Sequence, residues 1–480
     1  MKIAVVGTGY VGLVSAACFA ELGHTVTGID IDAAKIEKLK SGKSTIYEPG
    51  LEELIQKGLS AKLLSFTIDL KSALPDSAIV FCAVATPPGE GSKADLRAVF
   101  TVADAVATHA DHDLLFVTKS TVPVGTGKKC EERINAILAA RFSKDAPPSP
   151  NLQSPISIPV ISNPEFLREG LAVSDTLMPE RIVVGVNGMM KKMQRMQKKS
   201  SSESSASSVS SASFIDARKM MEELYRPITR VGKPLLFMSR ESAEIVKYAS
   251  NAFLATKISF INMLSELCEK TGANIRDVAA GMGHDSRIGP RFLHAGIGYG
   301  GSCFPKDVKA LLALAREEGL DFGIVEATDR INTHQRKRFF DQILKALPAK
   351  ATVGIWGLSF KPKTDDMRDA PSLDIVRALL NAGHTIRAYD PAAMENARML
   401  FGSALLPGDS LRYFELHSPI GAARGSDAVV LLTEWDVFRG IDLRELKSVM
   451  KGRDLFDGRN VYEPKEIAEA GLTYHGIGIG

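Results

Sequence analysis

The chain is poor in cysteine and tryptophan, and it lacks any long hydrophobic run. Its 480 residues include five cysteines and two tryptophans. The cysteines form no C-x-x-C pair and no regular framework, which favours free thiols in a reducing, cytoplasmic compartment over a disulfide-rich secreted protein. No apolar run reaches the length of a membrane span, so we expect no membrane partner.

The chain also lacks a strong excess of charge. It carries 59 Lys and Arg against 56 Asp and Glu, a formal net charge of +3 at pH 7. This balance gives no argument for nucleic-acid binding, and we expect no nucleic-acid partner. The composition, 45% hydrophobic and 24% charged, is ordinary for a globular protein. The length predicts two or three domains.

The first thirty residues predict a dinucleotide-binding unit. Residues 2–6 resemble a buried strand, residues 11–22 a helix, and residues 24–30 a second strand. Between the first strand and the helix lies the pattern G-x-G-x-x-G, formed by Gly7, Gly9, Tyr10, Val11 and Gly12. The pattern alone is weak, but this context makes it strong. For the same reason we expect no signal peptide here, despite Lys2 and the apolar stretch that follows it.

Each residue of this pattern has an expected physical role. Gly7 permits the tight turn, Gly9 lets the backbone approach a pyrophosphate, and Gly12 lets the helix pack on the strand. The helix N-terminus then faces the phosphates. Asp30, eighteen residues after Gly12, is expected to bond the adenosine ribose and to repel a 2′-phosphate, which favours NAD over NADP. Lys35 lies close enough in sequence to complicate that choice.

Strands and helices continue to alternate along most of the chain. Further strands are expected at residues 79–84 and 114–118, and again after residue 351. Residues 239–271 read as one long amphipathic helix, and a second helix begins near Pro305. The sequence therefore predicts an α/β protein with two Rossmann-like, doubly wound domains joined by a central helical domain. The segment that ends at Asp390 repeats the pattern of the segment that ends at Asp30.

Three domains are expected from this organisation: residues 1–218, 219–335 and 336–480. The first contains a low-complexity insertion at residues 189–213, with a serine-rich tract over residues 200–213. Such a segment cannot bury a core, so we expect it to be disordered. The sequence does not assign a role to this tract.

Cys303 is the strongest candidate for a nucleophile. It lies in Gly300-Gly301-Ser302-Cys303-Phe304-Pro305-Lys306-Asp307, just before a predicted helix N-terminus whose dipole, with Lys306, would stabilise a thiolate. The glycines of residues 296–301 would let backbone N–H groups converge on an anion. Asp307 fits either catalysis or capping of the helix, with equal weight. The other cysteines (Cys18, Cys82, Cys130 and Cys268) are expected to be packing residues.

Several long segments together resemble one family. The chain resembles the nucleotide-sugar dehydrogenases of the UDP-glucose/GDP-mannose dehydrogenase family over nearly its whole length, apart from the insertion. The segments that carry the resemblance are GTGYVG (7–12), KSTVPVGT (119–126), SNPEFLREG (162–170), PERIVVG (179–185), KYASNAFLATKISFIN (247–262), DSRIGPRFLHAGIGYGGSCFPKD (285–307), FKPKTDDMRDAPS (360–372) and FDGRN (456–460).

The resemblance implies a four-electron oxidation of UDP-glucose to UDP-glucuronate with NAD as cofactor. An aldehyde formed in the first oxidation is captured by Cys303 as a thiohemiacetal, oxidised to a thioester and hydrolysed. Covalent capture retains a reactive aldehyde and creates a carbon that can be oxidised again. The resemblance also implies a homodimer or higher homo-oligomer, for which the long helix suits an interface, although that helix could equally form an intramolecular core.

The resemblance assigns roles to further residues, all numbered in this chain. Lys247 and Asn251 are four residues apart, and from the sequence alone a solvated helix face is the better interpretation of them. The implied catalytic residues are Cys303, Lys247, Asp307, Asn251, Glu165 and Thr121. The implied cofactor contacts, besides the glycine turn and Asp30, are Lys35, Thr86, Thr121, Glu169, Lys306 and Arg368. The implied substrate contacts are Glu165, Phe166, Leu167, Arg168, Lys247, Asn251, Arg287, Phe292, Leu293, His294, Gly296, Gly300, Lys361 and Arg459. No metal site is expected.

Alternatives remain at this point. The same chemistry fits UDP-N-acetylmannosamine or GDP-mannose. A non-catalytic NAD-binding protein would have no reason to keep Cys303, Lys247, Asn251 and Asp307 together. A single-step hydroxyacid dehydrogenase would not need Cys303. The C-terminal domain lacks G-x-G-x-x-G at residues 356–360, so we assign to it the sugar nucleotide rather than a second dinucleotide.

Overall fold

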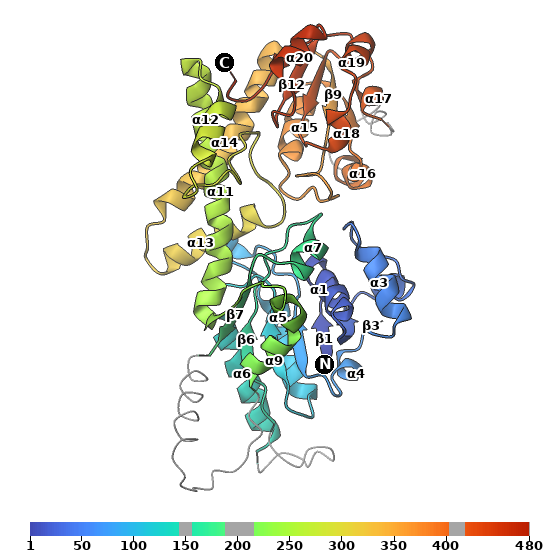
Figure 1. Cartoon of the computed structure of the whole chain (residues 1–480), viewed down its shortest axis with the longest axis vertical. Coiled ribbons are helices and arrows are strands. Elements are labelled where there is room, and N and C mark those ends of the chain that lie inside the picture. Colours follow the sequence, from blue (N-terminus) through green and yellow to red (C-terminus); the bar gives the residue numbers. More distant parts are fainter. Residues whose placement is uncertain (144–155, 188–215, 403–417, 480) are drawn as a thin grey trace. The chain divides into compact units, whose positions relative to one another are not determined.

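A computed structural model describes residues 1–143, 156–187, 216–402 and 418–479 of the chain. The predicted insertion at residues 189–213 lies outside these ranges. The chain divides into two compact units, Met1–Ala249 and Ser250–Gly480, which are described in turn (Figure 1). Within the described ranges, no helix is both long enough and apolar enough to cross a membrane.

The first unit is built on an eight-stranded sheet in the order β3-β2-β1-β4-β5-β6-β7-β8. All neighbouring strands are parallel except β6 and β7. The order of the first six strands, 3-2-1-4-5-6, is the one typical of dinucleotide-binding domains. The strands are β1 (Lys2–Val6), β2 (Thr25–Ile29), β3 (Leu64–Thr67), β4 (Ile79–Cys82), β5 (Leu115–Thr118), β6 (Val160–Ser162), β7 (Ile182–Val186) and β8 (Leu235–Ser239).

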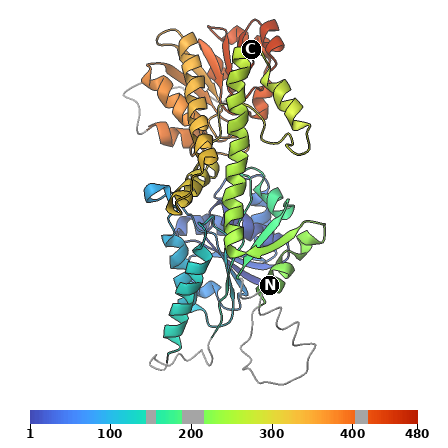
Figure 2. The ribbon, with the colours of Figure 1, turned by 90° about the vertical axis from the view of Figure 1, so that its left-hand side faces the viewer.

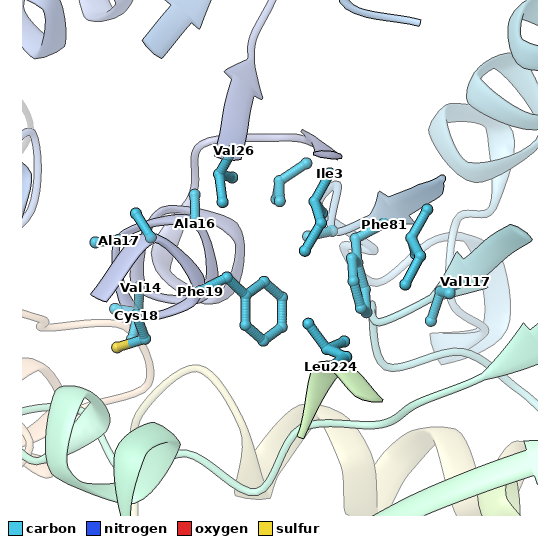
Figure 3. Close-up of a cluster of buried hydrophobic side chains, with 14 of the residues drawn as sticks. Ile3, Val14, Ala16, Ala17, Cys18, Phe19, Val26, Phe81, Val117 and Leu224 are labelled. Carbon is cyan, nitrogen blue, oxygen red and sulfur yellow. The ribbon is translucent and has the colours of Figure 1, made fainter. Parts of the chain in front are cut away.

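Helices cover both faces of this sheet because its strands are apolar on both sides. In β1, Ile3 and Val5 join one buried cluster, while Ala4 and Val6 join the other. Figure 3 shows part of the first cluster, where Phe19 of α1 points toward Phe81 and Leu224. The helical segments of the unit are α1 (Tyr10–Glu21), α2 (Ala33–Lys40), α3 (Leu51–Ser60), α4 (Leu70–Ala73), η1 (Glu90–Ser92), α5 (Arg97–His109), α6 (Thr126–Arg141), α7 (Ala172–Leu177), α9 (Ala217–Leu224) and α10 (Arg226–Thr229).

One long helix, α11 (Arg240–Thr271), begins in the first unit and ends in the second. Figure 2 shows it as an unbroken green helix. The expected long helix over residues 239–271 is therefore confirmed. Because Lys247 and Asn251 are one helical turn apart, they lie on the same side of α11.

The second unit places helices before a five-stranded parallel sheet in the order β10-β9-β11-β12-β13. This 2-1-3-4-5 order is the other common doubly wound arrangement. The strands are β9 (Thr352–Trp356), β10 (Thr385–Tyr389), β11 (Ala428–Leu431), β12 (Asp454–Asp457) and β13 (Thr473–His475). The remaining helices are α12 (Ile275–Gly283), α13 (Phe304–Glu317), α14 (Gly323–Ala346), α15 (Pro371–Asn381), α16 (Met394–Gly402), α17 (Pro419–Ala423), α18 (Asp436–Arg439), α19 (Leu443–Val449) and α20 (Pro464–Glu469).

The second sheet is also buried on both faces. In β11, Val430 belongs to a cluster with residues of α14 and α15, whereas Val429 belongs to a cluster with residues of α17 and α19. Two doubly wound sheets with a helical region between them in sequence confirm the predicted α/β fold class.

Candidate active site

The glycine turn after β1 has the geometry that the sequence predicts. Gly7 has φ +97°, and a Cβ there would lie 2.7 Å from the carbonyl oxygen of Ala83. A Cβ on Gly12 would overlap the carbonyl oxygen of Gly7. Both positions therefore exclude a side chain, because the atoms they would meet are backbone atoms that cannot move aside.

The third glycine differs, because its surroundings are open. A Cβ on Gly9 would meet no atom within 4 Å. Gly9 is the N-cap of α1, no side chain caps this end, and the first turn carries no acidic residue. The first N–H groups of a helix point outward and attract anions. This end of α1 therefore fits the pyrophosphate of a dinucleotide.

Asp30 follows β2 beside this turn. Its Oδ2 accepts hydrogen bonds from the Thr8 backbone N–H at 2.9 Å and from Thr8 Oγ1 at 2.8 Å. Burial opposes ionisation of Asp30, but the hydrogen bonds from Thr8 and Asp32 and the charge of Lys35 outweigh it, so the pKa of Asp30 lies below its ordinary value. Lys35 Nζ lies 3.8 Å from Oδ2. The ionised carboxylate suits a ribose hydroxyl and disfavours a 2′-phosphate.

A buried carboxylate, Glu48, connects this turn to another loop. Glu48 accepts a hydrogen bond from the Tyr10 hydroxyl, and its two oxygens also accept the Gly170 N–H at 2.6 Å and the Ala172 N–H at 2.7 Å. Glu48 is 7% exposed. It therefore attaches the loop that ends at Gly170 to the first turn of α1, a contact that the sequence did not predict.

Glu165 and Lys247 form a buried ion pair in the first unit. Lys247 Nζ lies 2.7 Å from Glu165 Oε1, and both side chains are almost fully buried. Burial opposes ionisation of Glu165, but the charge of Lys247 and its hydrogen bond overcome this, so the pKa of Glu165 lies below its ordinary value. The expected solvated position of Lys247 is wrong, because this side chain is 3% exposed.

A second buried lysine lies near this pair and was missed as a site residue. Lys119 Nζ donates to Asn163 Oδ1 at 3.2 Å. Burial lowers the pKa of Lys119 to about 8, with the nearby charge of Lys247 contributing in the same direction and that of Glu165 opposing it. Lys119 directly follows β5, and its place at the carboxyl end of a parallel strand was a signal that could have found it.

Thr121 and Thr86 come together in the same unit. Thr86 Oγ1 donates to the Thr121 carbonyl oxygen at 2.9 Å. Thr121 and Lys247 both line a small cavity, whose other lining residues are Thr118, Ser120, Val122, Ser162, Pro164 and Glu244. Hydroxyl and charged groups on one small cavity suit a bound water molecule.

In the second unit, Cys303 is the N-cap residue of α13, which carries proline in its first turn. The thiol is half-buried, and Ser302 Oγ lies 3.6 Å from its Sγ. The other four cysteines are buried, as predicted for packing residues. A thiol at a helix N-terminus is in the setting that favours the thiolate.

Asp307 is fully buried in the first turn of the same helix. Its Oδ2 accepts a hydrogen bond from Asn251 Nδ2 at 2.6 Å, and its Oδ1 accepts one from Lys306 Nζ at 2.6 Å. The carboxylate thus bonds two side chains, a setting that the sequence did not predict. Asn251, Lys306 and Asp307 therefore form one polar cluster, and Asp307 lies one helical turn after Cys303.

Two glycine N–H groups of the loop before Cys303, a loop expected to converge on an anion, are bonded within the protein. The N–H groups of Gly296 and Gly301 already donate to Asn262 Oδ1 and to the Arg368 carbonyl oxygen, both at 2.9 Å. The glycines instead allow close packing, since a Cβ on Gly301 would lie 2.6 Å from the Phe360 ring and one on Gly300 would overlap the Asp369 carbonyl.

Arg459 holds this loop from the C-terminal side of the unit. Its guanidinium donates to the carbonyl oxygens of Gly298 at 3.1 Å and Leu432 at 2.9 Å, and it pairs with Glu434 at 3.3 Å. Burial lowers the pKa of Arg459, although Glu434 opposes this. Lys361 lies over the Phe360 ring at 5.3 Å.

The remaining predicted contacts differ in their surroundings. Glu169 and Leu293 are buried, whereas Arg168, Arg287, His294 and Arg368 are exposed. Three of these arginines form ion pairs with nearby aspartates: Arg168 with Asp175, Arg287 with Asp285 and Arg368 with Asp366. The Leu167 N–H donates to Glu165, Phe166 stacks against Arg181, and Phe292 adopts a left-handed conformation with φ +67°.

Comparison with known families matches three models along the chain. They are the UDP-glucose/GDP-mannose dehydrogenase family NAD-binding domain at residues 1–199, its central domain at residues 241–334 and its UDP-binding domain at residues 354–464. The three matches follow each other in chain order and carry one family description.

Individual proteins match over the full length. The UDP-glucose 6-dehydrogenase of Rhizobium meliloti (strain 1021) is 42% identical over 482 residues, covering 100% of this chain and 99% of that protein. A solved UDP-glucose dehydrogenase from Pyrobaculum islandicum is 34% identical with a TM-score of 0.81, covering 100% of this chain and 98% of that one. A UDP-D-ManNAc dehydrogenase structure from Pyrococcus horikoshii is 26% identical with a TM-score of 0.77, covering 100% of both chains.

Proposed function

The chain belongs to the UDP-glucose/GDP-mannose dehydrogenase family and is an NAD-dependent dehydrogenase, and we propose that it oxidises UDP-glucose to UDP-glucuronate. The proposal takes its substrate from the full-length relatives. We further propose three domains: residues 1–218 for NAD, residues 219–335 with the nucleophile, and residues 336–480 for the UDP-sugar.

NAD, when bound, accepts a hydride in each of two oxidations. We propose that it binds at Gly7, Gly9, Gly12 and Asp30. The chain's own residues perform the remaining chemistry. The C6 alcohol loses a proton and a hydride to become an aldehyde, and the Cys303 thiolate adds to the aldehyde carbon to give a thiohemiacetal. Loss of a second hydride and proton gives a thioester, and water then releases the carboxylate and the thiolate.

Proton transfer and charge stabilisation fall to the buried polar residues. Lys247 and Asp307 exchange protons with the substrate oxygen, and Asn251 donates a hydrogen bond to the oxygen as negative charge develops there. Glu165 and Thr121 order the water that hydrolyses the thioester. Buried groups of this kind are already oriented by their own partners, which is what electrostatic stabilisation of a transition state requires.

The observation that carries the proposal is the setting of Cys303. Cys303, with a half-buried thiol, is the N-cap residue of α13, and the first turn of that helix carries Asp307, bonded to Asn251 and Lys306. A dehydrogenase that stopped at the aldehyde would not need a thiolate in this place. Covalent capture therefore explains why the cysteine stands beside a proton-handling cluster.

The proposal is tested by the NADH yield from limiting UDP-glucose with excess NAD. We expect two NADH per sugar and UDP-glucuronate as product. Cys303→Ala is expected to abolish acid formation while keeping a capacity for the first oxidation. An acid yield from that variant at the wild-type rate would disprove the covalent route, and one NADH per sugar in the wild type would show that the aldehyde escapes.

A second substrate is favoured by one comparison. The Pyrococcus horikoshii structure, a UDP-D-ManNAc dehydrogenase, covers the whole of this chain. UDP-N-acetylmannosamine is therefore the alternative if UDP-glucose yields no NADH. Failure with both sugars would point to the non-catalytic role.

We also propose that the chain forms homo-oligomers through α11. Phe253, Phe260 and Leu267 recur every seven residues along this helix with Met263 between them, and all four are exposed. Large exposed apolar side chains on one stripe mark an interface. By the resemblance, Arg287 reaches a neighbouring subunit. Light scattering of the purified chain tests this, and a monomeric mass would contradict it.

The free cysteines support a reducing, cytoplasmic location.

A further inference from the structure

Lys119 is a buried cation that the proposed mechanism does not use. The residue is 6% exposed, and its backbone N–H is fixed to the Cys82 carbonyl oxygen at 2.9 Å. Its ammonium lies 5.9 Å from the centre of the Phe81 ring and donates to Asn163 Oδ1 at 3.2 Å. Among the residues that the structure describes, this amide oxygen is the one acceptor of a hydrogen bond from the ammonium.

The amide that receives Lys119 is held in a single orientation. Asn163 Nδ2 donates to the Val183 carbonyl oxygen at 2.8 Å, so Oδ1 must be the atom that faces the ammonium. The same oxygen accepts the Tyr225 hydroxyl at 2.6 Å. Burial raises the pKa of Tyr225, so its hydroxyl remains a neutral donor. Lys119 is thus held by a neutral group and not by a carboxylate in contact with it.

Holding an ammonium in this way is unfavourable for folding. A buried charge with a neutral partner loses more hydration energy than one hydrogen bond returns. Such a group points to function when it lies beside other buried charges. The charged and titratable groups that act on Lys119 are Glu165, Lys247 and the Cys18 thiol. The first two are the ion pair to which the proposed reaction assigns proton chemistry.

We propose that Lys119 is a positioning residue for the reaction, a second buried cation that keeps Glu165 ionised and favours release of a proton by Lys247. The inference rests on the proposed function, because that function assigns proton transfer to Glu165 and Lys247. Its structural part rests on three observations: the burial of Lys119, its hydrogen bond to Asn163 two residues before Glu165, and the small cavity that its neighbours Thr118 and Ser120 line together with Lys247. Lys119 attracts the negative charge of Glu165 and repels the positive charge of Lys247, and both effects act through a buried region of low polarity.

The inference explains why Lys247, and not Glu165, would exchange the proton in this ion pair. An isolated Lys–Glu pair holds its proton on the lysine, because each partner stabilises the charge of the other. A third charge of positive sign weakens the hold of Lys247 on its proton without protonating Glu165. Lys247 can then exchange a proton with a substrate oxygen while Glu165 remains an acceptor for water.

The first test is the pH profile of kcat for Lys119→Met, a substitution of similar length without charge. Loss of the cation raises the proton affinity of both Glu165 and Lys247. We therefore expect the limb of the profile that reports this pair to move to higher pH by about one unit. Tyr225→Phe is the matched control, because it removes a hydrogen bond to the same Asn163 oxygen and no charge. Its profile is expected to keep the wild-type position.

The second test does not depend on activity. The depressed pKa of Lys119 means that the unfolded chain binds this proton more tightly than the folded chain. The penalty is complete below about pH 8 and disappears as the pH rises toward the ordinary value of about 10.5. Lys119→Met is therefore expected to raise the unfolding midpoint at pH 7 by about 3 °C, and this advantage should shrink above pH 8.

The outcomes separate the possible roles. A lower unfolding midpoint with an unmoved pH profile would assign Lys119 to packing and overturn the inference. An unmoved profile with a raised midpoint would also overturn it, because the cation would then be costly without affecting the pair. If the wild type oxidised no UDP-sugar, the proposed function would fail, while the stability test would still report whether Lys119 is a strained buried cation.

Discussion

The two doubly wound sheets of the chain each have the same kind of glycine turn after one central strand. Gly7 after β1 and Gly357 after β9 both have positive φ, +97° and +90°. Their N–H groups donate to the last residue of the adjacent strand, Ile29 at 2.7 Å and Tyr389 at 2.9 Å. In each fold, an aspartate that directly follows the adjacent strand then accepts a hydrogen bond from the residues after the glycine.

The folds differ in what surrounds that aspartate. Asp30 is half-buried and accepts hydrogen bonds from Thr8 and the Asp32 N–H. Asp390 is 1% exposed and receives six donors: the N–H groups of Leu358, Ser359, Ala392 and Ala393, the Ser359 hydroxyl and the Trp435 indole. A carboxylate offers about four acceptor positions, so Asp390 has none left for a ligand.

The helices that follow the two turns differ as well. After β1, α1 begins at Tyr10, immediately beyond the glycine turn. After β9, residues 357–370 intervene before α15 begins at Pro371. The first turn thus offers a helix N-terminus and an available carboxylate, and the second offers neither. The same backbone turn therefore has open surroundings suited to a ligand after β1, whereas after β9 its aspartate is taken up by the protein itself.

The largest effect is expected from Gly12→Ala. The new Cβ would overlap the Gly7 carbonyl oxygen, which cannot move without opening the turn. We expect a loss of about 3 kcal/mol or more in the free energy of unfolding, measured by denaturant titration. Gly9→Ala is the control, since its Cβ meets no atom within 4 Å. That variant should keep its stability and bind NAD more weakly. Equal stability of both variants would contradict the conclusion that Gly12, and not Gly9, is required for packing of the turn.

A somewhat smaller effect is expected from Asp390→Asn. One carboxylate oxygen becomes an amide NH₂, which leaves buried donors such as the Ser359 N–H facing another donor. The expected loss of unfolding free energy is about 2–3 kcal/mol. The preference for NAD over NADP should not change, because this carboxylate is saturated by the protein. A changed cofactor preference would mean that the second turn also contacts the dinucleotide.

The smallest effect is expected from Asp30→Ala. Removal of the available carboxylate should weaken NAD binding by about tenfold and bring the NAD and NADP affinities closer together. Isothermal titration of both cofactors measures this directly. The unfolding midpoint should fall less than in Asp390→Asn, because Asp30 receives fewer buried donors. An unchanged ratio of the two affinities would remove the reason for assigning NAD to this turn.

Most of the fold follows from local patterns in the sequence. The strand at β1 and the helices α1 and α11 were predicted because their apolar residues repeat at a fixed period and glycine ends or begins them. Strands β3, β6, β7, β8 and β13 were not predicted. Their pairing depends on residues far away in the chain, and periodicity does not report such pairing.

The site was predictable only where a motif carried it. The glycine turn and Cys303 have local signatures, and the structure gives both the expected setting. Lys247 reads as a surface lysine from its helix alone, because burial of its ammonium depends on Glu165, more than eighty residues earlier. The position of Lys119 after β5 was a usable signal, but the burial of its ammonium depends on Asn163, more than forty residues later. The close packing of Gly300 and Gly301 against Asp369 and Phe360 was not predicted, because those partners lie far away in the sequence.

Because of Glu48, the glycine turn after β1 cannot be exchanged by itself for the turn of another protein. Here the Tyr10 hydroxyl and the Gly170 and Ala172 N–H groups all depend on this one carboxylate. A transplanted turn that lacks the tyrosine would leave Glu48 buried without one of its donors. A successful exchange must therefore transfer three separate stretches of sequence as one unit.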